Sequence, residues 1–156
     1  MKVNVGVLVE LENRGMKPAN SGVITLARQN NPADVYAIVV NGDKSLVDED
    51  LARFGIENVI HISLLQNRSG NPDVKARAVI DAMNHFEITC LFALSTSTGK
   101  DILPRIAALM DAPLVMDCVD VDLEKSIACT SQYSGKTMAT VKVTGAVAVF
   151  GVRPNV

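Results

Sequence analysis

The sequence predicts a single α/β domain over residues 1–156, built on a parallel, doubly wound sheet that ends in an antiparallel β meander. Three observations predict this fold class. Strand-like and helix-like segments alternate through successive βα units, which indicates right-handed crossovers and helices on both faces of the sheet. Several strand-like segments are apolar throughout, as buried parallel strands are. With 48% of its 156 residues hydrophobic, the chain can bury one full core.

The first two βα units follow directly from the N-terminus. Alternating valines in Val3–Val9 predict a strand with one β-branched face. The segment Pro18–Gln29 predicts a helix, because its proline falls in the first turn and its apolar residues share one side. The apolar run Val35–Val40 predicts the second strand. Apolar residues at helical spacing in Val47–Phe54 predict the second helix, and Gly55 suits the position just beyond a helix end.

The next two units complete the alternation. The run Val59–Ile62 predicts the third strand. Apolar residues recur at helical spacing through Asn71–Phe86, so a third helix is expected there. The apolar segment Ile88–Leu94 predicts a fourth strand, which enters a Ser/Thr/Gly turn and then an apolar-faced helix that runs to Met110.

The pattern changes after the fourth helix. Leu114–Val121 predicts a further strand, and three β-rich runs follow it at Ser126–Tyr133, Thr137–Val143 and Ala146–Val152. Turn signals separate these runs. Together they predict an antiparallel meander, which would give the domain an additional β surface for a partner.

The turn after the fourth strand is the candidate functional site. Ligands of parallel α/β sheets bind at the carboxyl ends of strands, and the free N–H groups of a helix start favour a phosphate or carboxylate. The candidate anion- or nucleotide-binding residues are Ser95, Thr96, Ser97, Thr98, Gly99 and Lys100. The alternative interpretation is that these hydroxyl residues only cap the helix and close the turn.

Neighbouring residues limit what this turn can be. It is not a nucleotide-binding P-loop, because Leu94 occupies the position of the motif's first glycine and Asp101 follows the lysine. Pro104 is best accommodated in the first turn of a helix. A helix capped at Thr98 would therefore be kinked, whereas one capped at Asp101 would not. In the second case residues 95–100 form an open loop.

Composition excludes several classes of protein. The net charge is −2 and the basic residues are scattered, which argues against a nucleic-acid surface. No apolar stretch reaches the roughly 18 residues that a membrane helix needs, so a soluble protein is expected. The cysteines are odd in number and lack the spacing of zinc or redox sites; they are Cys90, Cys118 and Cys129. We expect buried free thiols in a reducing cytoplasm.

Other polar residues are better explained by structure than by catalysis. His61 and His85 are expected to be structural, because a histidine acts as a base only beside a nucleophile or metal. Four acidic residues straddle a strand end and its turn: Asp117, Asp120, Asp122 and Glu124. They could bind a hard cation, but solvated edge charges are expected. Tyr133, with Lys136 and Lys142, is expected to be an exposed turn residue. No catalytic or metal-binding residue is therefore predicted.

Three segments carry a resemblance to a known family: GKDILPRIAALMDAPLVMDCVDV, YSGKTMATVKV and FGVRPNV. In this order and spacing they closely resemble the N-terminal domain of the electron transfer flavoprotein alpha subunit, and the opening segment VGVLVELENRGMKPANSGVITLARQ fits the same domain. The resemblance implies a HUP-like fold, of the adenine nucleotide alpha hydrolase-like type. It also implies a role in electron transport as a scaffold packed against a beta-type subunit.

The resemblance has one departure. Family members continue past the VRP segment into a second domain that holds most FAD contacts, whereas this sequence stops at Val156. No residue is therefore carried over as a flavin ligand, and FAD is expected only in the complete family complex. The family's AMP is held by the beta subunit, so the resemblance does not assign AMP to the turn at 95–100.

Three functions remain as hypotheses. The first is a non-enzymatic scaffold of the electron transfer flavoprotein alpha type, which needs a beta-type subunit and a separate FAD domain. The second is a free-standing module that binds an adenine nucleotide or another anion, and the third is a hydrolase or ligase of the HUP class, which fold alone does not support. We also expect the isolated chain to form a homodimer or self-associate weakly, through the meander between Ser126 and Val152 or through the fourth helix near Ile106 and Met110.

Overall fold

The computed structural model describes residues 2–155. Its strands are β1 (Asn4–Leu8), β2 (Leu11–Glu12), β3 (Gly15–Met16), β4 (Val35–Val40), β5 (Asn58–Ile62), β6 (Ile88–Leu94), β7 (Leu114–Asp122), β8 (Ile127–Gln132), β9 (Thr137–Lys142) and β10 (Ala148–Val152). Its helices are α1 (Asn20–Gln29), α2 (Lys44–Arg53), α3 (Pro72–His85) and α4 (Ser97–Leu109). Eight strands form one sheet in the order β5-β4-β1-β6-β10-β7-β8-β9, and β2 pairs with β3 in a small separate hairpin.

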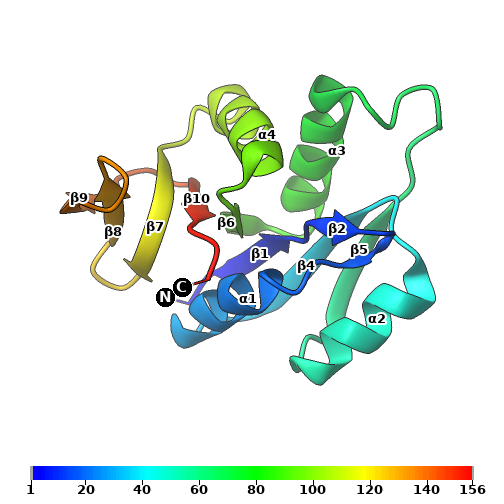
Figure 1. Cartoon of the computed structure of the whole chain (residues 1–156), viewed down its shortest axis with the longest axis horizontal. Coiled ribbons are helices and arrows are strands. Elements are labelled where there is room, and N and C mark those ends of the chain that lie inside the picture. The colour runs from blue at the N-terminus through cyan, green and yellow to red at the C-terminus, as the bar shows by residue number, and fades with distance from the viewer. Residues whose placement is uncertain (1, 156) are drawn as a thin grey trace.

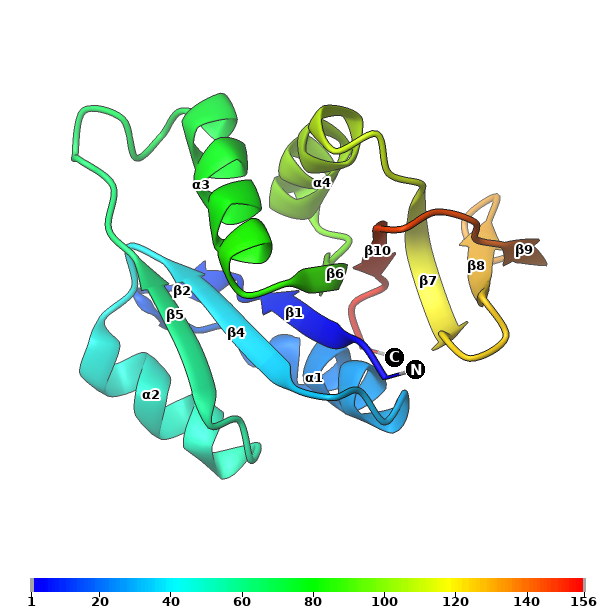
Figure 2. The ribbon, with the colours of Figure 1, turned by 180° about the vertical axis from the view of Figure 1, so that it is seen from behind.

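The helices cover the two faces of this sheet in pairs. α1 and α2 pack on one face and α3 and α4 on the other, as the two views show (Figures 1 and 2). Ile24 and Leu51 anchor the first pair, and Val79 and Leu103 anchor the second. The predicted doubly wound α/β architecture is confirmed. The helices change face between β1 and β6, so these adjacent strands flank the topological switch point of the sheet.

The C-terminal run differs from the prediction. β10 pairs in parallel with both β6 and β7 in the interior of the sheet, so its assignment to the meander is wrong. All five of its residues are buried, as a strand with neighbours on both sides requires. The antiparallel meander consists of β7, β8 and β9 alone, and β9 forms the edge of the sheet.

Caps of two kinds position the helices. The side chain of Asp43 accepts hydrogen bonds from the first turn of α2, and that of Asn71 does the same for α3.

On α4, Ile106 is fully buried in the core. Leu109, between Ile106 and Met110 in the sequence, is 49% exposed, so self-association through this part of the helix stays a prediction, as does self-association through the meander.

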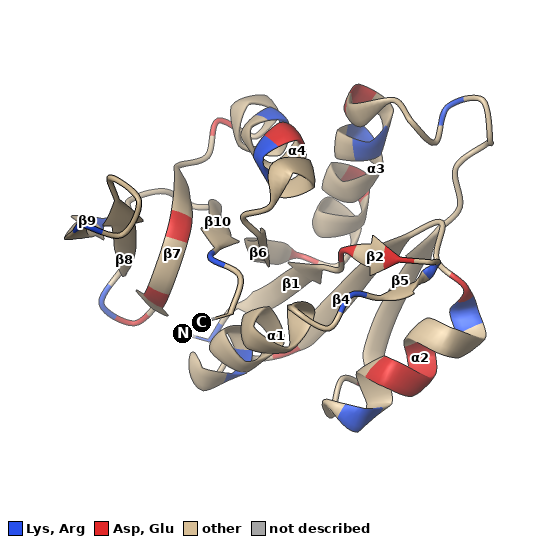
Figure 3. Ribbon diagram, viewed as in Figure 1, with Lys and Arg blue, Asp and Glu red and all other residues tan. Residues whose placement is uncertain are grey.

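Charged residues are distributed over the whole domain. Lysines, arginines and acidic residues alternate along the helices, the meander and the loops, and no element carries a basic stripe (Figure 3). Among the helices of residues 2–155, none combines the length and the apolar character needed to cross a membrane.

Candidate functional site

The predicted turn is shorter than expected, because α4 begins almost directly after β6. Thr96 is the N-cap, and its hydroxyl accepts a hydrogen bond from the Gly99 N–H at 3.2 Å. Residues 97–100 therefore form the first turn of the helix, and neither Thr98 nor Asp101 is its cap. Pro104 lies inside α4, where it removes one N–H from the helical ladder.

Gly99 explains why the helix can begin so early. A Cβ atom at this position would overlap the carbonyl oxygen of Leu94, at the end of β6. Only glycine permits this approach of the α4 backbone to the strand. The glycine that the sequence suggested for a ligand loop thus serves close packing between a strand and a helix.

The two residues at the beginning of the turn hold strands together. Ser95 is buried, its N–H donates to the carbonyl of Val152 at 2.7 Å, and its hydroxyl accepts from the Asp117 N–H at 2.9 Å. The hydroxyl of Thr96 donates to Glu10 Oε2 at 2.5 Å. For Ser95 and Thr96 the structure therefore gives each polar side chain a partner within the protein.

Lys100 points toward the meander. Its Nζ atom lies 3.4 Å from Asp117 Oδ2, and both residues line an open hollow of about 580 Å³ together with Arg153. The six predicted residues are therefore divided: Thr98 and Gly99 border one pocket, whereas Lys100 borders another.

The pocket bordered by Thr98 and Gly99 lies at the switch point of the sheet. We call it the switch-point pocket; its lining includes Val9, Glu10, Lys75, Leu94, Thr98 and Ile102. Its volume is about 150 Å³. The carboxyl ends of β1, β4 and β6 form its floor, and α3 and α4 each supply a wall, which is the position where parallel α/β proteins bind ligands.

Glu10 is held in place from several sides. Besides the bond from Thr96, its Oε1 atom accepts a hydrogen bond from Lys17 Nζ at 3.1 Å. The buried amide of Asn20 also fixes the backbone, because it donates to the Glu10 carbonyl and accepts from the Glu10 N–H. The carboxylate is 17% exposed and keeps a defined position at the pocket wall.

Lys75 is the functional candidate that sequence reasoning missed. It lies one turn into α3 and lines the same pocket as Glu10. Burial lowers the pKa of the Lys75 ammonium, and the negative charge of Glu10 partly opposes that effect. A signal was present in the sequence, since a lysine near a helix N-terminus is unfavourably placed relative to the helix dipole.

The other sequence candidates lie elsewhere. His61 Nε2 is 2.7 Å from Asp48 Oδ1, in a separate hollow beside α2. Tyr133 is 77% exposed at the tip of the β8–β9 hairpin. Within residues 2–155, no three histidine, cysteine or acidic side chains converge as metal ligands would. The three cysteines are free thiols, and burial is the main cause that raises the pKa of Cys118 to about 12.

Comparison with known proteins identifies the family. A family model described as the electron transfer flavoprotein domain matches residues 5–156, which is almost all of the chain. The chain belongs to this family. The resemblance noted in the sequence is thereby confirmed, and the parallel sheet with antiparallel strands at its far end is consistent with the family's fold.

Individual members of the electron transfer flavoprotein family match at lower identity. The chain is 25% identical over 164 residues to a probable mitochondrial alpha subunit from Schizosaccharomyces pombe, with 99% of this chain and 48% of the relative covered. It is 24% identical to a probable mitochondrial alpha subunit from Caenorhabditis elegans, covering 88% of this chain and 41% of that protein. An alpha subunit from Clostridium acetobutylicum is 26% identical over 69% of this chain and 33% of its own length. The chain thus spans less than half the length of these relatives.

Proposed function

We propose that this chain is a scaffold domain of the electron transfer flavoprotein alpha type, which takes part in electron transfer only with a beta-type subunit and an FAD domain. The match of the family to residues 5–156 carries this proposal, because it takes in the entire α/β domain. The alpha subunits that it resembles extend well beyond the matched segment. We infer that a further domain supplies the flavin contacts.

The arrangement of polar groups supports a role other than catalysis. The hydroxyls of Ser95 and Thr96 are engaged in hydrogen bonds that hold the strands and the helix start. His61 pairs with Asp48 in a separate hollow beside α2. A hydrolase would need a nucleophile and a base within hydrogen-bond reach of one another.

The small volume of the switch-point pocket argues against a whole cofactor. Sites for organic ligands of drug size usually measure roughly 300–1,000 Å³. The switch-point pocket, at about 150 Å³, is too small for FAD or for a complete AMP molecule. We therefore propose that this domain alone retains neither, and that FAD joins the complete complex.

The meander supports the partner part of the proposal. Its strand β9 is an edge of the sheet with alternating exposed residues, and it projects beyond the helix layers (Figure 1). Unpaired edges and exposed β surfaces are where another chain can pack. We propose that the beta-type subunit covers this surface.

Reconstitution tests the proposed function. The purified chain alone is expected to be colourless, whereas mixing it with a beta-type subunit, the FAD-binding domain of an alpha relative and FAD should yield one flavin-containing complex on gel filtration. A stoichiometric flavin absorbance band from the chain alone would contradict the proposal, as would a complex of the other two components that excludes this chain.

A second function, a free-standing anion-binding module, is favoured by one observation. The switch-point pocket contains a lysine at the carboxyl ends of parallel strands. This function does not require a partner chain, and anion binding by the isolated domain would support it.

A further inference from the structure

Lys75 differs from the other lysines in its surroundings. Among the lysines of residues 2–155, only Lys17 and Lys75 are partly buried, and the rest are exposed. Lys17 is paired with Glu10, but no carboxylate lies within 4 Å of Lys75 in the described chain. A partly buried ammonium without a contacting counter-ion is costly, because burial removes hydration that the more distant charge of Glu10 only partly offsets. An anion in the pocket would supply a contacting negative charge.

The charges around the pocket sum to a positive value. Glu10 and Lys75 line the pocket, and Lys17, which lies outside the lining, neutralises Glu10 in an ion pair. Asp73, the acidic residue closest along α3, is turned to Arg105 at 2.7 Å and is mostly exposed. The local charge is therefore +1, which favours a negatively charged ligand.

The wall of the pocket also contains an acceptor. A carboxylate offers about four lone-pair positions, and Glu10 uses two of them for Lys17 and Thr96. A ligand that carries both a negative charge and an O–H group can therefore pair with Lys75 and donate to Glu10. Phosphate retains a proton near neutral pH and meets both demands, whereas sulfate does not.

The volume limits the ligand to a small anion. About 150 Å³ accommodates a phosphate beside the apolar side chains of Val9, Leu94 and Ile102. Thr98, at the rim, adds a hydroxyl that can donate.

We propose that the switch-point pocket binds inorganic phosphate in a protonated form, with Lys75 as its counter-ion and Glu10 as acceptor of its hydrogen. This site involves Lys75 in place of Lys100. It goes beyond the scaffold role, since no flavin or partner subunit takes part in it.

The site is tested by titrating the isolated chain with inorganic phosphate in a calorimeter, which measures the affinity for phosphate. Lys75→Met should weaken phosphate binding at least tenfold. Lys100→Met, which removes the lysine that pairs with Asp117, is the matched control and should change the affinity less than twofold. Equal phosphate affinity of wild type and Lys75→Met would overturn the proposal, as would absence of binding by wild type or loss confined to Lys100→Met.

Anion selectivity provides a readout that does not depend on folding of one variant. Wild type should bind phosphate at least tenfold more tightly than sulfate, and Glu10→Gln should reduce this ratio. AMP should bind no more tightly than phosphate, because only its head enters. Equal binding of sulfate, or clearly tighter binding of AMP, would contradict the proposed chemistry.

Thermal melting distinguishes lost binding from lost structure. Lys75→Met removes a desolvated charge and should melt at or above the wild-type temperature without phosphate. A large decrease in its melting temperature would instead assign Lys75 a structural role and overturn the proposal. Failure of phosphate binding would leave the reconstitution with a beta-type subunit unaffected, so the two proposals are tested separately.

Discussion

The hydroxyl of Thr96 donates to Glu10 Oε2 at 2.5 Å, although 86 residues separate the two in the chain. Thr96 caps α4 and Glu10 follows β1, so this bond joins the two elements that flank the switch point. The same threonine also accepts from the Gly99 N–H. The Thr96 side chain thus caps the helix and also links it to the segment that follows β1.

Replacement of Thr96 by valine should remove both bonds while preserving the shape of the side chain. Loss of an N-cap costs about 1 kcal/mol and loss of a hydrogen bond to a charged group costs about 1.5–3 kcal/mol. We expect Thr96→Val to lower the free energy of unfolding by about 3 kcal/mol in urea titrations. Thr96→Ser keeps the hydroxyl and should stay close to wild type. Equal stability of wild type and Thr96→Val would show that neither bond contributes.

Substitution of Gly99 tests the close approach of α4 to β6. A methyl group there would overlap the Leu94 carbonyl oxygen, which is backbone and cannot move aside cheaply. Gly99→Ala should destabilise the domain by about 3 kcal/mol or prevent folding. Gly70→Ala is the matched control, because a Cβ at Gly70 meets nothing within 4 Å. Comparable urea midpoints for the two variants would contradict this explanation.

The sequence predicted the alternation of strands and helices well because burial imposes regular periodicity on them. The prediction failed at Ala148–Val152. This apolar run follows two hairpin strands and was therefore expected to be a third strand of the meander, but all of its residues are buried because it lies in the centre of the sheet. Strand order depends on contacts distant along the chain, which local patterns do not contain. The same limit applies to the site: folding brings Glu10 and Lys75 to the same pocket from distant parts of the chain, whereas Ser95–Lys100 are contiguous in the sequence and can be recognised there.

Thiol reactivity should report the burial of the cysteines. Burial raises the pKa of the Cys118 thiol to about 12, with a smaller contribution from the charge of Asp117, and burial also raises the pKa of Cys90. Because the thiolate is the reactive form, both cysteines should react far more slowly with iodoacetamide at pH 8 in the folded protein than in urea. Rapid native labelling of Cys118, located by mass spectrometry, would contradict its assigned burial.

The same pKa shift predicts how stability changes at alkaline pH. The unfolded thiol of Cys118 loses its proton near pH 9, whereas the folded one retains it up to about pH 12. The unfolded state is therefore favoured progressively as pH rises from 9 toward 12. Cys118→Ala should show a smaller decline in the free energy of unfolding over this range. Parallel curves for wild type and variant would exclude the thiol as the cause.

The cap of α2 predicts a second pH dependence, at the acid end. The hydrogen bond from the Ser45 hydroxyl is the main cause that lowers the pKa of Asp43, and the Leu46 N–H adds to it. The stabilisation is present above the unfolded value of 3.8 and is lost as pH falls through the lower folded pKa. Asp43→Asn retains a capping oxygen without the charge, so its stability should depend less on pH between about 2 and 4 than that of wild type. An unchanged slope would contradict the role of Asp43.

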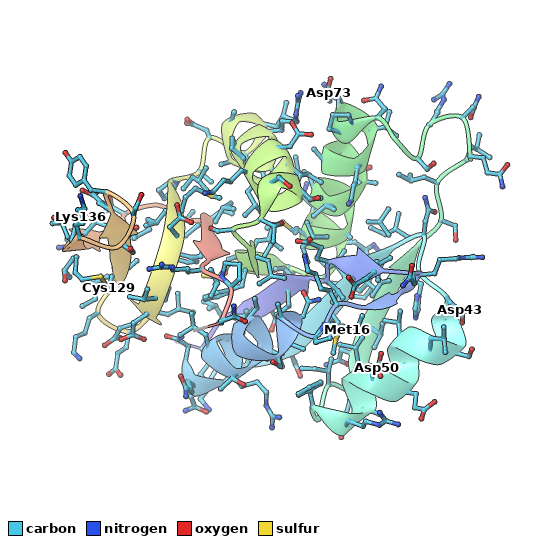
Figure 4. All side chains as sticks on the ribbon, viewed as in Figure 1. Met16, Asp43, Asp50, Asp73, Cys129 and Lys136 are labelled. Carbon is cyan, nitrogen blue, oxygen red and sulfur yellow. The ribbon has the colours of Figure 1, made fainter. Side chains whose placement is uncertain are left out.

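The last prediction concerns self-association through the meander. β9 is an unpaired edge strand, Met138 is 51% exposed on it, and Lys136 lies at the outer end of the hairpin (Figure 4). Edge strands attract a second edge unless charges such as lysines prevent it. Lys136 lies outside β9 and the single lysine within the strand is its last residue, Lys142, so most of this edge is uncharged. We expect light scattering to show a dimer at high concentration of the isolated chain.

Met138→Lys should shift that equilibrium to the monomer. Leu65→Lys changes a residue that is 71% exposed in the loop before α3, away from the meander, and should leave it unchanged. If both variants dimerise like wild type, another surface is responsible. If the wild-type chain stays monomeric across the whole concentration range, the meander does not need covering, and the anion-binding function becomes the stronger of the two proposals. Because a beta-type subunit would compete for the same edge strand, its addition should dissociate the homodimer in proportion to the amount of heteromeric complex formed.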